Sequence, residues 1–497
     1  MTLKISNMKK NRARFLLLFT MLAAFQEMTG EERVVFNPVS PTKGIQEAID
    51  KASGNGGGTV FIPKGTYPIS CSIIIPKSGN LTICGEGAST IIEVEKEYKA
   101  FASTDLKKGD LVVSVKDPGN FKLHDKVVIL DDQQSGEHGT TIAKISGKKG
   151  NSIMLDTPLR NTYKVSDNAR IIHTFHIMTT EGFSSNIIVP NIVVRDLQFC
   201  GGLKKEFQGF HFWNVNGGVV LMGENIRVEN CIVRDIPADG IFVGGGLIQK
   251  ENFWVKGCLV ENAGERGIHI GNDPRNVTIS DNHFKKIGGI GIYLCHGSQR
   301  TIITGNTICD IGYFETASDT IYYLEQQGVK DDEYRIKTKV AGIGGIGGGG
   351  RRSFEHDKYV IISNNIIYNS TGSGISFLKW FQEEGGRPGE NMIISGNIIY
   401  NIEQSGLFIF AAQSINASDN SITDCLTGID CSESVYCFFT SNTVRNCKTA
   451  FRFYSTDEKF LTTRNVSGNN MIINCLNPLS EGKGAIENIN TNHIISY

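Results

Sequence analysis

Apolar and polar residues alternate in short segments that recur along a long stretch of the chain, from about Ile226 to Ile473. The first half of each copy reads apolar–x–apolar–small–x–Asn, as in Val277-Thr278-Ile279-Ser280-Asp281-Asn282. The asparagines that close successive copies are Asn282, Asn306, Asn365, Asn397, Asn420, Asn442 and Asn469, which are 24, 59, 32, 23, 22 and 27 residues apart. A period in this range is typical of solenoid proteins. The interval of 59 residues corresponds either to two turns or to one turn with a large insertion.

The second half of each copy is a glycine followed by alternating side chains, as in Gly267-Ile268-His269-Ile270 and Gly291-Ile292-Tyr293-Leu294. Strict alternation predicts β-strands with one buried face. Because no helical pattern separates these strands, βαβ units are excluded, and successive copies are expected to pair in parallel, one above another. The sequence therefore predicts an all-β protein whose main body is a parallel β-helix, in which stacked turns share one apolar core.

This prediction gives structural roles to two residue types. Asparagine at one corner of each turn suits a residue that tolerates left-handed backbone and whose amide bonds to its copies above and below. The glycine before each strand is expected to supply a positive φ. The recurring asparagines are therefore interpreted as structural and not as a catalytic row.

Composition narrows the classes of partner. The 497 residues include 56 glycines and carry a formal net charge of -1. The glycine content suits a turn-rich coil, and the near-neutral charge gives no indication of nucleic acid or of an anionic membrane surface as a partner. The twelve cysteines include no Cys-x-x-Cys pair and no histidine at zinc spacing. Five of them lie in or beside strands of the repeat and are interpreted as small buried apolar residues, namely Cys231, Cys258, Cys309, Cys431 and Cys447. No metal site is predicted.

The first residues predict export. Lys9, Lys10, Arg12 and Arg14 precede an apolar run from Phe15 to Phe25 that is too short to span a bilayer. Residues 1–28 are therefore interpreted as a signal peptide, and the protein is expected to be secreted or periplasmic, with no integral membrane segment once the signal is removed. A monomer is expected.

Residues 36–100 contain the most specific sequence motif of the chain. Ile45, Ala48, Ile49 and Ala52 share one face of a predicted helix, and residues 56–67 read Gly-Gly-Gly-Thr-Val-Phe-Ile-Pro-Lys-Gly-Thr-Tyr. This stretch resembles the N-terminal cap and first turns of the pectate lyase-like (pectin lyase fold) superfamily. The resemblance implies a right-handed parallel β-helix whose open end is closed by a short capping helix. It is not specific for one activity.

The rest of the chain divides into segments that contain the repeat and segments that lack it. Residues 101–175 lack the repeat and contain short apolar strands between Gly and Asn turns, which predicts a small inserted β domain. Residues 176–480 return to the repeat and are assigned to the parallel β-helix. Two segments, 311–341 and 378–391, interrupt it and are interpreted as loop insertions, a common location for binding residues.

The alternating strands also predict a column of side chains that point out of the coil, spaced about 4.8 Å apart. The column contains Phe242, His269, Tyr293, Ser376, Phe408, Asp430 and Arg452, and His211 would extend it. Aromatic rings beside polar groups are typical of sugar-binding surfaces. The candidate substrate-binding residues are Phe242, Arg266, Tyr293, His296, Arg351 and Trp380.

Two acidic residues precede strands of adjacent turns, Asp239 and Glu265. Glycoside hydrolysis requires two carboxyl groups, one of them protonated, at a separation of about 5 to 9.5 Å. Equivalent positions on neighbouring turns can reach such a separation. Asp239, Glu265 and His269 are therefore the candidate catalytic residues, and an enzyme that cleaves glycosidic bonds of a polysaccharide by hydrolysis is the preferred prediction.

Two alternatives stay open. A polysaccharide lyase acting on a uronate-containing polymer would need a base and a cation, for which His269, Tyr293 and Arg266 are available. Either a side-chain cation or calcium would then neutralise the uronate carboxylate, and otherwise no cofactor is predicted. A non-catalytic carbohydrate-binding or adhesion protein would use the stacked face as a binding platform. Motifs of single families, such as the Trp-Ile-Asp-His of pectate lyases, are absent, and Arg335-Ile336-Lys337 matches polygalacturonases without its companion motifs.

Overall fold

The computed structural model describes residues 30–95, 98–134, 139–182, 187–202, 217–244, 250–271, 274–295, 297–312, 340–347, 357–379, 389–455 and 461–495. The predicted signal peptide at 1–28 lies outside these residues, as do 313–339 and 380–388, which make up most of the two predicted loop insertions. Among the described residues, no helix combines the length and the apolar character needed to cross a bilayer.

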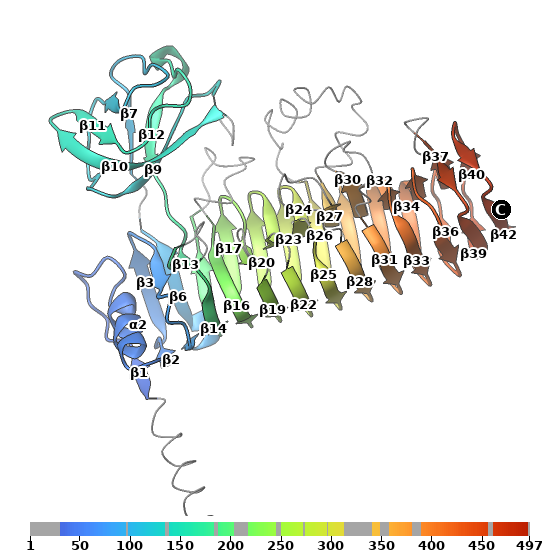
Figure 1. Cartoon of the computed structure of the whole chain (residues 1–497), viewed down its shortest axis with the longest axis horizontal. Coiled ribbons are helices and arrows are strands. Elements are labelled where there is room, and N and C mark those ends of the chain that lie inside the picture. Colours follow the sequence, from blue (N-terminus) through green and yellow to red (C-terminus); the bar gives the residue numbers. More distant parts are fainter. Residues whose placement is uncertain are drawn as a thin grey trace, which may run out of the picture.

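The chain coils so that each strand pairs in parallel with strands one turn before and one turn after it, which confirms the predicted parallel β-helix (Figure 1). The pairings define three sheets that run along the coil. Sheet 1 contains β4 (Ile73–Ile75), β13 (Met178–Thr180), the start of β16 (Val219–Glu229), β18 (Ile241–Gly244), β21 (Arg266–Ile270), β24 (Ile290–Cys295), β27 (Ala341–Gly347), β30 (Ser373–Lys379), the ends of β32 (Ile398–Phe410) and β34 (Ser421–Ser432), β37 (Thr449–Tyr454) and β40 (Asn477–Glu481).

Sheets 2 and 3 complete each turn. Sheet 2 contains β1 (Glu31–Arg33), β2 (Gly58–Phe61), β5 (Leu81–Cys84), β14 (Val189–Arg195), the end of β16, β19 (Lys250–Lys256), β22 (Pro274–Ser280), β25 (Gln299–Thr304), β28 (Asp357–Ser363), β31 (Gly389–Ser395), β33 (Gln413–Ser418), β35 (Phe438–Thr440) and the starts of β39 (Val466–Ile473) and β42 (Ile489–Ile495). Sheet 3 contains β3 (Gly65–Ile69), β6 (Thr90–Val94), β15 (Gln198–Cys200), β17 (Ile232–Ile236), β20 (Leu259–Ala263), β23 (His283–Ile287), β26 (Thr307–Ile311), β29 (Ile366–Ser370), the starts of β32 and β34, β36 (Thr443–Arg445) and the ends of β39 and β42. A short pair, β38 (Thr462–Thr463) and β41 (Ala485–Ile486), lies near the C-terminal end.

Alternation along these strands produces the core. In sheet 1, Ile241, Ile268, Ile292, Ile343 and Ile375 occupy matching positions in successive strands. Each is fully buried in one continuous apolar cluster inside the coil. Because every turn contributes its own apolar side chains, the core extends with the coil and no single turn can bury its apolar face alone.

The ambiguous interval of 59 residues is one turn with an insertion. Strand β24 pairs directly with β27, and β25 pairs with β28. The side chains of Asn306 and Asn365 are in contact, with Nδ2 of Asn306 donating to Oδ1 of Asn365 at 2.9 Å. The residues 313–339 are thus an addition to one turn between β26 and β27.

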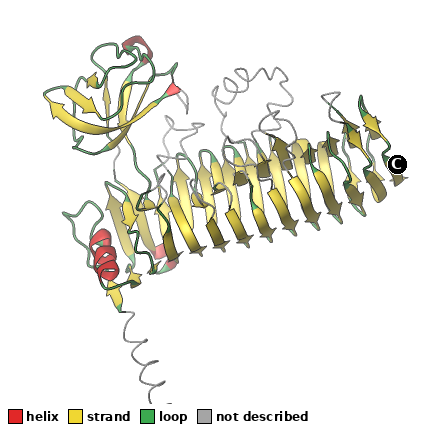
Figure 2. Cartoon of the chain, in the orientation of Figure 1, coloured by secondary structure: helices red, strands yellow, loops and turns green. Residues whose placement is uncertain are grey.

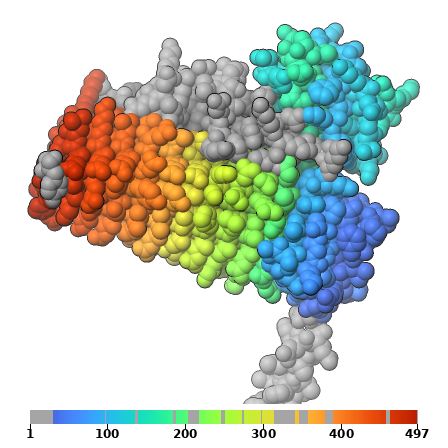
Figure 3. All heavy atoms as spheres, turned by 180° about the vertical axis from the view of Figure 1, so that it is seen from behind, coloured from blue at the N-terminus to red at the C-terminus, as the bar shows by residue number. Residues whose placement is uncertain are grey.

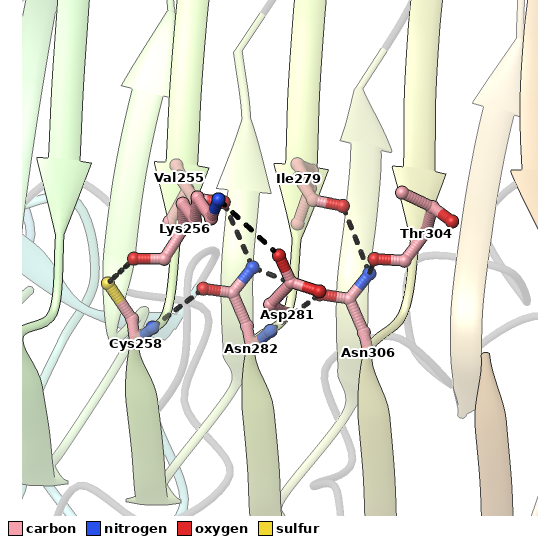
Figure 4. A network of polar contacts seen from close by, with 8 residues as sticks. All are labelled: Val255, Lys256, Cys258, Ile279, Asp281, Asn282, Thr304 and Asn306. Carbon is pink, nitrogen blue, oxygen red and sulfur yellow. Dashed lines mark hydrogen bonds and ion pairs between the residues drawn. The ribbon is translucent and has the colours of Figure 1, made fainter. Parts of the chain in front are cut away.

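A ladder of buried asparagines joins sheets 2 and 3. Figure 4 shows its start, where the backbone N–H of Cys258 donates to Oδ1 of Asn282 at 2.9 Å and Nδ2 of Asn282 donates to Oδ1 of Asn306 at 3.0 Å. The same side-chain bond repeats through Asn306, Asn365, Asn397, Asn420, Asn442, Asn470 and Asn492. Each Asn amide therefore satisfies groups on neighbouring turns, which confirms the predicted contacts between copies.

Two details of the predicted turns are wrong. The left-handed residue is the one before the ladder asparagine, such as Asp281 (φ 58°) and Asn364 (φ 56°), because the ladder side chain must point inward from ordinary backbone. At the last copy Asn469 has the positive φ and Asn470 takes the ladder position, so the predicted spacing is one residue short there.

The glycines before the sheet 1 strands do not have the predicted positive φ. They are required by close packing between turns instead. A Cβ atom on Gly267 would lie 2.5 Å from the backbone oxygen of Gly291 and 2.6 Å from the ring of Phe284, and one on Gly240 would lie 2.9 Å from the oxygen of Gly267. A side chain at these positions would push adjacent turns apart.

Two further elements lie at the N-terminal end. Helix α2 (Ile45–Gly54) packs against β1, β2 and β4 and buries Ile45, Ala48, Ile49 and Ala52, the face predicted from the sequence (Figure 2). Six antiparallel strands form a separate sheet in the order β7 (Lys99–Phe101), β12 (Arg170–His173), β9 (Lys126–Leu130), β10 (Thr141–Lys149), β11 (Ser152–Leu155) and β8 (Val112–Ser114). This sheet has its own apolar cluster and stands beside the N-terminal turns of the coil (Figures 1 and 3). We call residues 98–173 the inserted domain.

Candidate functional site

Three adjacent strands of sheet 1 bring together the main sequence-predicted residues. Parallel pairing places Phe242 (β18), His269 (β21) and Tyr293 (β24) in one register, each pointing out of the coil. Phe242 and His269 have ring centroids 4.6 Å apart, and His269 and Tyr293 have centroids 4.9 Å apart. The predicted stacking of these three residues is therefore confirmed.

The column differs from the prediction at two points. Gly344 lies between Tyr293 and Ser376, because the turn that contains β27 was not recognised in the sequence. Val220, not His211, precedes Phe242 in register. His211 itself lies outside the described residues, as do the candidate binding residues His296, Arg351 and Trp380.

Asp239, in the turn before β18, is the partner of His269. Nδ1 of His269 lies 2.7 Å from Oδ2 of Asp239. The Asp239 side chain has no exposed surface, and the Arg266 guanidinium lies 3.4 Å from its other oxygen. The carboxylate is therefore enclosed between an imidazole and a guanidinium, both from β21.

Arg266 joins the two candidate acids. Its NH2 group lies 2.6 Å from Oε1 of Glu265, while its NH1 group contacts Asp239. The guanidinium also lies over the ring of Tyr293, 4.4 Å from the centroid, a cation–π geometry. Because both carboxylates contact one guanidinium, they are no further apart than the acid pair of inverting glycosidases, about 6.5 to 9.5 Å.

Burial and neighbouring charges set the protonation of these groups. Burial and the Arg266 guanidinium lower the pKa of His269, but the Asp239 carboxylate and a contact with Cys295 raise it, so the pKa lies above its ordinary value. Burial, followed by the Cys295 thiol, raises the pKa of Tyr293 well above its usual range. Burial acts against the Arg266 charge, yet Glu265 and Asp239 raise its pKa further. The imidazolium form of His269 is thus favoured.

The sequence analysis missed Cys295. It ends β24 and lies two positions after Tyr293, so the same alternation that found Tyr293 also directs Cys295 out of the coil. Its thiol interacts with the side chains of both His269 and Tyr293. All twelve cysteines are free thiols. Most of the cysteines predicted to lie in the core belong to the core cluster of the coil, but Cys309 lies outside this cluster, next to His283.

Further along the column, Asp430 and Arg452 form a second polar pair. The guanidinium of Arg452 donates through Nε to Oδ1 of Asp430 at 3.1 Å and through NH2 to Oδ2 at 2.5 Å, and Ser405 donates to the same carboxylate at 3.1 Å. Arg452 also lies over the ring of Tyr454, 4.7 Å from the centroid. This bidentate pair joins adjacent strands and is separated from His269 by several turns.

No group of three or more His, Cys, Asp or Glu side chains suited to hold a metal ion occurs in the part of the chain that the structure describes. The groups brought together at the described site are one histidine–carboxylate pair, a second carboxylate, one guanidinium, one phenol and the thiol of Cys295. Such a set can transfer protons and stabilise charge.

Comparison with known proteins identifies the family of this fold. A family model described as "Right handed beta helix region" matches residues 165–333 and 336–496. No curated protein matches the sequence. Three solved structures each superpose with a TM-score of 0.51. They are the catalytic unit of a GH87 alpha-1,3-glucanase from Streptomyces thermodiastaticus (13% identity, 94% of this chain and 67% of that one), PfbA, a surface adhesin of Streptococcus pneumoniae (12%, 90% and 89%), and the tailspike of E. coli bacteriophage HK620 in complex with a pentasaccharide (12%, 90% and 67%). At these identities the likeness shows the fold alone.

Proposed function

The chain belongs to the right-handed β-helix family, and we propose that within this fold it hydrolyses glycosidic bonds of a polysaccharide. The observation that carries the proposal is the convergence of Asp239, Glu265 and His269 around Arg266 on one face of sheet 1. Glycoside hydrolysis requires a proton donor and a carboxylate that flank the scissile bond.

The charge of the cluster favours hydrolysis over elimination. Asp239 and Glu265 carry two negative charges, Arg266 one positive charge, and His269 at most one more. The described cluster is therefore neutral at most. Hydrolysis passes through an oxocarbenium-like, positively charged transition state that carboxylates stabilise. Elimination instead needs surplus positive charge beside a uronate carboxylate, and the Arg266 guanidinium already contacts two acids.

The geometry suggests separate roles for the two acids. The Glu265 side chain is 8% exposed and that of Asp239 is 0% exposed, so Glu265 is the carboxylate that meets a substrate. Asp239 is a positioning residue that orients and charges His269. In the proposed reaction His269 gives its proton to the leaving glycosidic oxygen as the C–O bond breaks. Water adds to the anomeric carbon and passes a proton to Glu265.

Support from related folds is limited to analogy. The glucanase acts on a glucan and the tailspike is bound to a pentasaccharide, so the same coil presents saccharide-binding surfaces in both proteins. Function is determined by a site and not by a fold, and the proposal therefore depends on the described residues.

The decisive experiment is a screen of the wild-type protein against neutral and acidic polysaccharides that measures new reducing ends and the ultraviolet absorbance of unsaturated uronates. We expect reducing ends without the absorbance. The Glu265→Gln variant should be about 10²–10⁴-fold less active. Its matched control is Glu261→Gln, because Glu261 lies on β20 in sheet 3, away from the cluster. Full activity of Glu265→Gln would exclude the proposed role.

One observation favours β-elimination as the second candidate. Arg266, Tyr293 and His269 are in mutual contact, which supplies a cation, a phenol and an imidazole for proton abstraction beside a uronate carboxylate. Unsaturated products on a uronate polymer would establish this route, and calcium dependence would then be tested by adding a chelator. If the wild type binds a polysaccharide without turnover, an adhesive role is indicated instead. PfbA, one of the similar structures, is a surface adhesin.

Export is part of the proposal, because the basic–apolar segment within residues 1–28 has the character of a signal peptide. Mass spectrometry of the mature N-terminus in the culture medium or periplasm tests it. An intact N-terminus retained in the cytoplasm would contradict export.

A further inference from the structure

The sheet of the inserted domain is apolar on both faces. In β9, Val127 and Ile129 belong to the domain's own core, while Val128 and Leu130 point to the opposite face. Ile172 of β12 joins Val128 and Leu130, and all three have no exposed surface. A small domain that packs its core on one side leaves such a second apolar face only where something covers it.

Ala238 of the coil packs against this second face. It forms one buried cluster with Val128, Leu130 and Ile172 and is itself fully buried. Ala238 directly precedes Asp239, the carboxylate that contacts His269. The inserted domain therefore touches the coil at the residue next to the candidate site.

The turn that carries Ala238 is also bonded to the turn before it and to the turn after it. The backbone N–H of Glu265 donates to the oxygen of Ala238 at 3.3 Å, and the N–H of Gly218 donates to the oxygen of Asp239 at 3.0 Å. A shift of Ala238 would therefore move the Asp239 side chain and disturb the position of Glu265.

We propose that the inserted domain is a positioning element of the site, and that its face formed by Val128, Leu130 and Ile172 fixes Ala238 so that the Asp239 carboxylate stays against His269. The effect on activity rests on the proposed function, whereas the coupling between the domain and the Asp239–His269 pair does not. Among the described residues, the titratable and charged groups that face His269 include Asp239 from the preceding turn, Arg266 on its own strand, and Tyr293 and Cys295 from β24.

The test compares two substitutions on the same strand. Leu130→Ala removes an apolar side chain from the buried cluster that contains Ala238. Ile129→Ala removes an equally buried side chain from the domain's own core, on the opposite face of the strand. The titration of His269 is followed by NMR of protein with isotope-labelled histidine, and the signal is assigned with His269→Gln. Asp239→Asn gives the reference for complete loss of the carboxylate.

We expect the His269 midpoint to fall in Leu130→Ala, in the direction of Asp239→Asn, and to keep its wild-type value in Ile129→Ala. An unchanged midpoint in Leu130→Ala, or equal falls in both variants, would overturn the proposal. If Leu130→Ala does not fold, Ala238→Gly replaces it, because this variant removes the contacting methyl group from the coil side; its midpoint must fall as well.

Activity supplies the second readout. A misplaced Asp239 should lower kcat about 10-fold or more with KM nearly unchanged, since small displacements of catalytic groups cost rate before they cost binding. If the wild type has no hydrolytic activity, the proposed function fails, and the titration alone then decides whether the domain positions the pair.

Discussion

Nδ1 of His269 lies 2.7 Å from Oδ2 of Asp239, although 30 residues separate them in the chain. The contact exists because parallel strands in register place each turn directly over the previous one. A histidine on β21 and the carboxylate just before β18 therefore meet across the gap between two turns. The pair gives the site a measurable electrostatic property, the raised pKa of His269.

The first prediction concerns this property. Asp239 holds the pKa of His269 above its ordinary value, so the charged imidazole stabilises the fold. This stabilisation is fully present below the unfolded pKa of about 6.5 and is lost as pH rises through the folded pKa. The advantage of the wild type over His269→Gln in melting temperature should therefore shrink as pH rises above about 6.5. An advantage that grows with pH would contradict the assignment.

His173 in the inserted domain is an internal contrast for the same titration. Burial lowers its pKa to about 4, against the opposing effect of Asp125. It should titrate far below His269 in one NMR series. Stability from neutral His173 is present above its unfolded pKa and is lost as pH falls toward about 4.

The second prediction concerns Arg266. Arg266→Met would leave the carboxylates of Asp239 and Glu265 buried without their shared cation, and we expect a loss of about 3–5 kcal/mol in the free energy of unfolding. Arg464→Met is the control, because its ion pair with Glu487 is exposed to solvent and should give no measurable change in melting temperature. Adding Asp239→Asn to Arg266→Met should restore part of the loss.

The third prediction concerns the asparagine ladder. Asn365→Ala removes the acceptor of the Asn306 backbone N–H and amide and leaves the Ile303 oxygen without its side-chain donor. Each buried group left unpaired costs about 1–3 kcal/mol, so the total should be at least about 2 kcal/mol. Asn416→Ala, at an exposed position of β33 outside the ladder, should change stability by less than about 0.5 kcal/mol. Thermal unfolding followed by circular dichroism measures both, and equal losses would refute the buried ladder as the cause.

The fourth prediction concerns Gly267, which precedes the strand segment that holds His269. An added Cβ would collide with the backbone oxygen of Gly291 and the ring of Phe284, so Gly267→Ala should cost about 1–3 kcal/mol. Gly54→Ala is the control, because no atom lies within 4 Å of its added Cβ. The double variant Gly267→Ala with Phe284→Leu tests the cause of this loss. A packing collision predicts that the smaller side chain at 284 recovers part of the loss, whereas strained backbone would leave the loss unchanged.

Periodicity in the sequence was sufficient to predict the coil and the stacking of Phe242, His269 and Tyr293. An alternating strand has only one way to bury its apolar face, and equivalent strands of a coil must lie in register. The positions of Asp239 and Glu265 followed from the same argument. The pattern also predicted which side chains leave the coil, but it carries no information on whether other residues then cover them, and His269 and Tyr293 are buried.

Features without a period could not be predicted in this way. The contact of Ala238 with Val128 and Leu130 joins a turn of the coil to a separately packed domain, and nothing in a single alanine indicates such a partner. The glycine prediction was wrong because a glycine required for close approach and one required for positive φ look the same in a sequence. The structure distinguishes them, because Gly267 has no positive φ and a Cβ added to it would lie 2.5 Å from the oxygen of Gly291.

The asparagine ladder has a beginning and an end that differ chemically. Cys258 starts it with a backbone donor, and Asn492 ends it by donating its amide to the hydroxyl of Ser467 at 2.7 Å. Every interior step exchanges the same amide donor and carbonyl acceptor, so whole turns could be removed or duplicated between these two residues without changing the chemistry of either terminus. The length of this protein is therefore adjustable in units of one turn, whereas cutting it at the last ladder bond would remove the Asn492 acceptor and leave the Asn470 amide its bond to the Phe439 oxygen.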